Sequence, residues 1–182
     1  MTPPNTMADR NKFFPPISTF VLSRHLLEVT VNVLQTEGQF KVESILFWAG
    51  TVRDGIATVS DILVPKGPGV IQQRSLVRVD DQIIAALCDV LDPPRLVLLG
   101  QVHTHLAAAY HSYTDNHFCF ETPGFLSVVV SRAGRDGAER WREWAFFECL
   151  GGPEFQPLTK RIVRRRFTMG SHDVGVHEIY AG

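Results

Sequence analysis

The sequence predicts an α+β or irregular α/β domain, and three observations lead to this class. Near-continuous apolar runs, typical of strands buried on both faces, recur along the chain. Two other stretches carry the apolar spacing and end residues of helices. Strands and helices do not alternate regularly, so a simple doubly wound fold is not predicted.

Length and composition exclude several classes of protein. The 182 residues suffice for one domain with its own core. Eighteen basic residues against nineteen acidic ones give a net charge of −1, which argues against a dedicated nucleic-acid binder. The three cysteines form no Cys-x-x-Cys pair, and no apolar run approaches the roughly 20 residues of a membrane span. We therefore expect a soluble, cytoplasmic protein with free thiols.

The first helix is expected over residues 23–37, closed by Gly38, and Asp80 is a plausible N-cap for a second helix over 81–91. A loop opens at 67–69 and a turn is expected at 123–124. Strands are expected at 42–52, 56–64, 95–102, 125–131, 144–150 and 154–167. This divides the chain into a loose arm, a domain and a tail: 1–16, 17–168 and 169–182.

His103 and His105 follow a buried strand at i, i+2 spacing, which puts both imidazoles on one side of an extended segment. Asp115 comes ten residues later, and Ser112 shares its face if a helix begins there. Two histidines and one carboxylate are a typical ligand set for catalytic zinc, which keeps its fourth position for water. A hydrolytic site also needs a base, and Glu43 is the candidate because it is the lone carboxylate of an apolar strand.

Each of these features has a plainer interpretation. A His-x-His pair at a strand end is often a solvated or hydrogen-bonded pair. Ser112-x-x-Asp115 also fits a helix capping box. Glu43 fits an exposed strand start, and the nearby His111 and His117 are consistent with bystanders. The combination, rather than any one residue, favours a metal site.

The same residues resemble a known family. The run from Glu43 to Gly50 resembles the Glu-x6-Gly strand that opens the JAB1/MPN metalloprotease domain, the JAMM family. His103-Thr-His105 followed by Ser112-Tyr-Thr-Asp115 resembles its His-x-His…Ser-x-x-Asp signature. Residues 123–130 resemble the strand that follows this signature, although Leu106 stands where family members often have proline.

The resemblance implies a JAMM/MPN fold, a cytidine-deaminase-like mixed β-sheet flanked by helices. It implies a Zn²⁺ ion held by three residues, with a base and an oxyanion donor beside it. By position these are the ligands His103, His105 and Asp115, the base Glu43 that activates the zinc-bound water, and Ser112, which stabilises the tetrahedral intermediate.

The implied activity is that of an isopeptidase or peptidase acting at the C-terminus of a ubiquitin-like protein. A chain without long insertions resembles the bacterial branch of the family, whose members accompany E1-like and E2-like proteins in ubiquitin-like conjugation operons, including antiviral ones. Expected partners are thus a ubiquitin-like protein or its conjugates and those enzymes, with no membrane and no nucleic acid. The rivals are a non-catalytic MPN-like scaffold and a zinc hydrolase of small peptide conjugates.

Two features fall outside this site. The densest charge in the chain is the basic run Lys160, Arg161, Arg164, Arg165 and Arg166. It predicts either a solvated face or a docking surface for a partner or nucleic acid. Phe13-Phe14, before two prolines, fits either a docking arm or a segment packed back on the domain.

Overall fold

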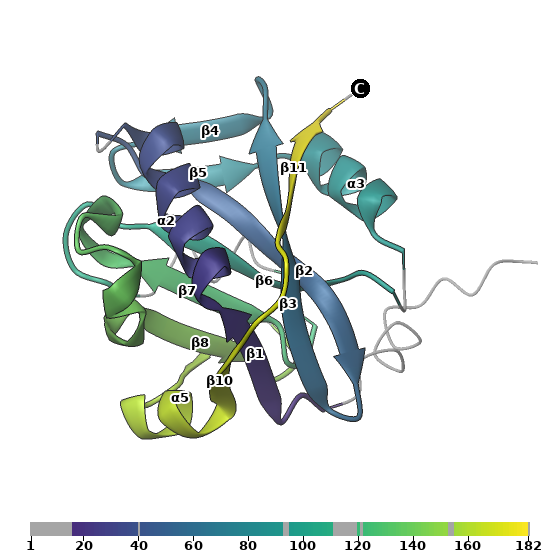
Figure 1. Cartoon of the computed structure of the whole chain (residues 1–182). Helices are drawn as coiled ribbons and strands as arrows, with labels where there is room; N and C mark the ends of the chain where they lie inside the picture. The colour runs from purple at the N-terminus through teal and green to yellow at the C-terminus, as the bar shows by residue number, and fades with distance from the viewer. Residues whose placement is uncertain are drawn as a thin grey trace, which may run out of the picture.

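The computed structural model describes residues 16–39, 41–92, 95–110, 120, 122–152 and 155–181. Within these ranges the chain forms a large β-sheet with helices packed against it (Figure 1). The strand order is β10-β1-β3-β2-β6-β7-β8-β9, and β11 also pairs with β3. Parallel and antiparallel neighbours both occur, which confirms the α+β class and the mixed sheet flanked by helices.

The elements are short, as is usual in a domain of this size. The strands of the large sheet are β1 (Thr19–Ser23), β2 (Ile45–Arg53), β3 (Ile56–Lys66), β6 (Val97–Thr104), β7 (Leu126–Val130), β8 (Ala145–Cys149), β9 (Phe155–Pro157), β10 (Phe167–Gly170) and β11 (Gly175–Tyr180). A separate hairpin consists of β4 (Val70–Gln73) and β5 (Leu76–Val79). The α-helices are α2 (Arg24–Gly38), α3 (Asp81–Val90) and α5 (Lys160–Arg166), and the 3₁₀ segments are η2 (Ser131–Gly134) and η3 (Ala138–Glu143).

Both predicted helices form, and Asp80 caps the second as the sequence indicates, while Ser23, expected as the first residue of the other helix, is its N-cap. The Ser23 side chain accepts from the backbone of Leu26, and Asp80 accepts from Ile83. The end of α2 differs from the prediction, because the left-handed residue is Gln39 rather than Gly38. Gly38 is needed for space instead, since a Cβ there would lie 3.2 Å from Oγ of Ser44.

The sheet has a core on each face. Leu46 and Trp48 of β2 pack with the apolar face of α2, which lies across the sheet in Figure 1. Ile45 and Phe47 alternate to the other face and pack with α3. Gly50 ends this buried run at a bulge, where a Cβ would collide with the backbone carbonyl of Thr58 in β3.

Several elements differ from the prediction. Residues 154–167 were expected as one strand, but only β9 is extended there and Lys160–Arg166 is helical. Thr159 caps this helix by accepting from Ile162, and Val163 is its buried residue. Because Val163 is the single buried residue in the two turns of this helix, the sequence shows no repeat of apolar residues at helical spacing.

The hairpin of β4 and β5 and the N-terminal strand β1 were not predicted at all. The segment 169–182, expected as a tail, contains β11, which pairs in parallel with β3 from Gly175 to Tyr180. Lys66 in β3 donates to Glu37 of α2 and pairs with Glu178 of β11. The hydrogen bond to Glu37 raises the pKa of the Lys66 amine.

Of the described cysteines, Cys149 is buried as expected but Cys88 is exposed, and both are free thiols. None of the helices in the described ranges combines the length and apolar character needed to cross a membrane. Most of the expected arm 1–16 lies outside the described residues.

Candidate metal centre

The site is built where the ends of β2 and β6 lie side by side. These strands are antiparallel neighbours, and Ile45 pairs with His103. The pairing continues to the next residues, because the Thr104 amide donates to the Ser44 carbonyl over 2.9 Å. One step further along this register brings Glu43 level with His105. Residues 60 positions apart in sequence therefore meet at one sheet end.

The alternation of strand side chains puts these groups on the same face of the sheet. Facing residues of an antiparallel pair share a face, so His103 lies on the side of Ile45, which is the α3 side. His105 remains beside His103, since their ring centroids are 5.2 Å apart. Glu43 lies two residues before Ile45, just outside β2, and is expected on this face if the strand alternation continues to it. If Glu43 is the base, the strand that follows it must lie beside the strand that leads to the histidines, and β2 and β6 do pair in this way.

Two of the plainer interpretations require solvent-exposed side chains, and the burial of the histidines and of Glu43 excludes that exposure. His103 is 1% exposed and His105 is 4% exposed, so neither is a solvated surface imidazole. Glu43 is 7% exposed, so it is not at an exposed strand start, although it precedes β2 rather than lying within it. Burial of a carboxylate beside two imidazoles costs desolvation free energy that an ordinary core would avoid.

The two imidazoles fit a shared metal ion. Their ring centroids are 5.2 Å apart, with the planes inclined by 53°. Two imidazole nitrogens held about 2 Å from one tetrahedral ion put their ring centroids roughly 5 Å apart. The donor chemistry also suits zinc, which binds neutral imidazole and carboxylate.

The third expected ligand, Asp115, lies outside the described residues, as do Ser112, His111 and His117. Among the residues that are described, no group of three or more His, Cys, Asp or Glu side chains is arranged to hold a metal. The nearest described residues on either side of these positions are Tyr110 and Phe120. The Tyr110 ring meets the His105 ring edge-on at 4.6 Å, and Phe120 meets Phe47 edge-on at 6.2 Å. Both flanking residues thus lie on the histidine face.

A buried hydrogen-bond clamp sets the register of Glu43 against the histidines. The Ser44 amide donates to Oγ1 of Thr104 over 2.9 Å, and the Ser44 hydroxyl donates to the carbonyl of Leu34 in α2 over 2.7 Å. The two hydroxyl oxygens are 3.2 Å apart, and both residues are almost fully buried. Thr104 stands between the two histidines in sequence, and Ser44 directly follows Glu43. Sequence reasoning missed both, and their adjacency to the motif residues was the available signal.

The unpredicted hairpin holds Glu43 from its other side. The Glu43 amide donates to the carbonyl of Gln73, the last residue of β4, over 2.8 Å. Backbone bonds thus fix Glu43 and Ser44 to two different elements. A base must be held in this way, because proton transfer requires a hydrogen-bonding geometry.

The histidine loop is braced by η2. The His105 amide donates to the carbonyl of Val130, and the His105 carbonyl accepts from the amide of Ala133, both over 2.9 Å. Arg132 and Ala133 have φ of 53°, in the left-handed region that costs a non-glycine residue roughly 1–2 kcal/mol. Gln35 of α2 donates to the Gly134 carbonyl over 2.8 Å and helps to hold this strained turn.

More buried polar side chains line the same face beneath the histidines. Gln101 pairs with Ser127 across β6 and β7, and its amide donates to the Ser127 hydroxyl over 3.2 Å. Both are almost fully buried. Gln101 and His103 of β6 and His105 just beyond its end therefore place buried polar side chains at every second position. Burying polar groups costs desolvation free energy, which distinguishes this strip from an apolar packing surface.

The structure thus defines a class of site: a buried imidazole pair with a carboxylate at the end of a mixed β-sheet. No known family profile matches the chain. It is 28% identical over 122 residues to the probable metalloprotease y4jG of Sinorhizobium fredii, covering 66% of this chain and 75% of that protein. This relative is named as a probable metalloprotease, so it supports the metalloprotease class, while the resemblance to the JAB1/MPN family rests on the motif.

One solved structure shares the fold, and a second aligns more weakly. Protein DSY2949 from Desulfitobacterium hafniense aligns with a TM-score of 0.60 and 12% identity, over 85% of this chain and 95% of that one. AF2198, a JAB1/MPN domain protein from Archaeoglobus fulgidus, aligns with a TM-score of 0.41 and 12% identity, over 78% and 95% of the two chains.

Proposed function

We propose that this protein is a zinc-dependent peptidase of the JAMM type. The observation that carries the proposal is the meeting of Glu43, His103 and His105 at one buried sheet end. The relative named a probable metalloprotease supports it. A non-catalytic scaffold would have no need to bury an ionisable cluster of this composition.

In this proposal His103, His105 and Asp115 hold the metal. A bound zinc ion supplies Lewis acidity and lowers the pKa of its water toward about 7. Glu43 accepts a proton from the attacking water and delivers it to the leaving amine. The backbone bond to Gln73 and the clamp of Ser44 hold the Glu43 backbone in register with the histidine segment. Burial excludes bulk water, which strengthens the electrostatic interactions of the site.

The proposed substrate is the peptide or isopeptide bond that follows the C-terminus of a ubiquitin-like protein. Its basis is the resemblance to the bacterial branch of the family, where E1-like and E2-like proteins belong to the same conjugation system. In this account the protein trims precursors or removes the ubiquitin-like protein from conjugates. An antiviral conjugation operon is one proposed setting.

A cleavage assay tests this substrate class. The zinc-loaded protein is incubated with a bacterial ubiquitin-like protein that carries a C-terminal peptide extension, and the product masses are measured by mass spectrometry. We expect release of the extension by the native protein and none by Glu43→Gln. Cleavage of dipeptides and amino-acid conjugates alone would favour the small-conjugate hydrolase. Tight binding without any cleavage would favour the scaffold.

In this proposal the Ser112 hydroxyl stabilises the oxyanion of the tetrahedral intermediate. The alternative is that Ser112 only caps a helix. Ser112→Ala should lower kcat about a hundredfold with an almost unchanged melting temperature if the hydroxyl faces the oxyanion. A cap alone would instead cost roughly 1 kcal/mol of unfolding free energy and little turnover. A destabilised variant with native turnover would remove Ser112 from the mechanism.

A further inference from the structure

The helix α5 carries four cations that the fold does not use. Val163 packs into the α2-face core, and Arg166 turns inward to a bidentate pair with Glu148 at 2.6 and 2.7 Å. The remaining basic side chains point to solvent: Lys160, Arg161, Arg164 and Arg165. Within the described part of the chain, none of these four makes an ion pair.

Two of these charges work against the helix that carries them. Lys160 and Arg161 lie in the first turn, where the helix dipole favours acidic side chains and none is present. Each also has a like charge one turn further on, in the pairs 160/164 and 161/165. Arg164 and Arg165 lie in the last turn, where the dipole favours cations, so local stability gives a reason for them but none for Lys160 and Arg161.

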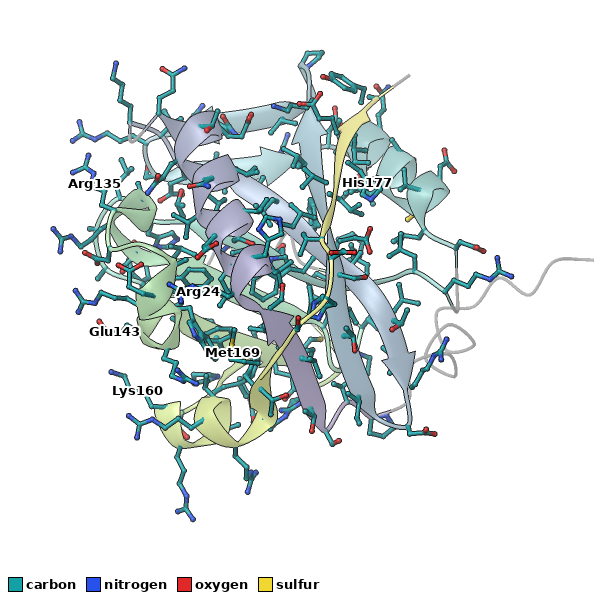
Figure 2. The ribbon with its side chains drawn as sticks, viewed as in Figure 1. Arg24, Arg135, Glu143, Lys160, Met169 and His177 are labelled. Atoms are coloured by element: carbon teal, nitrogen blue, oxygen red, sulfur yellow. The ribbon has the colours of Figure 1, made fainter. Side chains whose placement is uncertain are left out.

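A groove lies beside the helix. It has a volume of about 370 Å³ and is lined mainly by apolar atoms of α2, η3 and β10. Its apolar side chains are Leu27, Ala138, Trp141 and Met169. Met169 is 45% exposed and follows α5 directly along the chain, while the Phe167 ring between them lies 6.5 Å from Trp141. Figure 2 shows Lys160, Met169 and Arg24 along the same side of the molecule.

From this arrangement we propose that α5 and the groove bind an acidic polypeptide segment. An apolar side chain of the segment fills the groove against Met169, and its carboxylates lie along the arginines of α5. Arginine suits this role, because its planar guanidinium binds carboxylates in bidentate fashion. The surface lies on the α2 side of the sheet, away from the histidine face, so it docks a partner rather than the scissile bond.

The same observations disfavour nucleic acid. Glu28 and Glu139 border the groove, so a nucleic-acid strand, which carries a charge at every nucleotide, would be repelled there, whereas a peptide can place an uncharged side chain at that point. Trp141 is only 4% exposed, and Arg142 already lies over its ring at 4.5 Å, so it offers no stacking platform for a base.

Fluorescence anisotropy with the full chain tests the proposal. The probe is a fluorescein-labelled peptide of twelve residues, acidic except for two central leucines, and a labelled U12 oligoribonucleotide is its competitor. The test variant is Arg161→Gln/Arg164→Gln/Arg165→Gln. The matched control, Lys41→Gln/Arg53→Gln/Arg74→Gln, removes the same charge from exposed residues elsewhere.

We expect the peptide to bind the native chain and to lose affinity about tenfold in the α5 variant, since three exposed charge contacts are removed and each contributes modestly. The control variant should bind as the native chain does. Met169→Gln should weaken the leucine peptide but not one with alanine in its place. Equal loss in both triple variants, no binding to the native chain, or tighter binding of the oligoribonucleotide would overturn the proposal. The assay needs no metal and no turnover, so its outcome is independent of the peptidase.

Discussion

The two faces of the sheet use buried polar groups in different ways. On the α2 face the core is the larger one, and its buried polar groups are neutral hydroxyls with visible structural roles. Ser23 caps α2, and Thr30 accepts from the indole of Trp48. On the α3 face the apolar core is smaller, and beside it lie the carboxylate and imidazoles of Glu43, His103 and His105. The α2 face thus buries polar groups that serve the fold, while the other face carries a desolvation cost that the proposed function would explain.

The largest expected effect is at the histidines. His103→Ala or His105→Ala should lose the metal and reduce cleavage to background, because each removes one of three protein ligands. Asp115→Ala should behave in the same way. Metal analysis by mass spectrometry and the cleavage assay measure both losses on one sample. Full zinc content in either histidine variant would show that the imidazole pair is structural.

Glu43→Gln should separate chemistry from metal binding on the same face. Glutamine keeps the size of the side chain but cannot accept the proton, so hydrolysis should fall by at least about a hundredfold. Zinc content and substrate affinity should hold, which would make the variant a trap for a ubiquitin-like conjugate. Full turnover, or loss of zinc, would remove Glu43 from the role of base.

Leu26→Ala tests the opposite face. Leu26 is fully buried in the α2-face core, so truncation should lower the unfolding free energy by about 2–5 kcal/mol, as measured by urea denaturation. The folded variant should keep its zinc and its kcat at a temperature well below its transition. A large fall in kcat of the folded protein would mean that the two faces do not divide stability from chemistry.

A smaller effect is expected at the clamp between the faces. Thr104→Val preserves shape but leaves the buried Ser44 amide without its acceptor, at a cost of about 1–3 kcal/mol. Glu43 should then no longer be aligned with the histidines, so kcat should fall about tenfold while KM and zinc content stay unchanged. Thr104→Ser keeps the hydroxyl and should restore kcat. Equal kcat in the valine and serine variants would leave Thr104 with a purely structural role.

The sequence predicted the elements that carry strong local signals. The apolar spacing of residues 23–37 predicted α2, Asp80 predicted the start of α3, and the apolar runs of β2, β3 and β6 predicted the central strands. The hairpin of β4 and β5 was missed because its residues are only partly buried and show no alternation. α5 was missed because one buried residue sets no period, and β11 because its pairing with β3 depends on a contact more than a hundred residues away.

The site was predictable as a set of residue types and only partly as geometry. Motif spacing indicated Glu43, His103 and His105, and the β2–β6 register explains why they meet. Spacing could not indicate the clamp of Ser44 and Thr104 or the strained brace at Ala133, because both depend on tertiary hydrogen bonds. The roles of Asp115 and Ser112 stay predictions.

Elemental analysis of the native protein, purified without chelator, tests the central claim most directly. If the histidine face is a metal centre, the folded protein should contain about one zinc ion per chain, and a chelator should remove zinc and cleavage together. A folded protein that contains no transition metal, and that takes up none when zinc is added, would contradict the account.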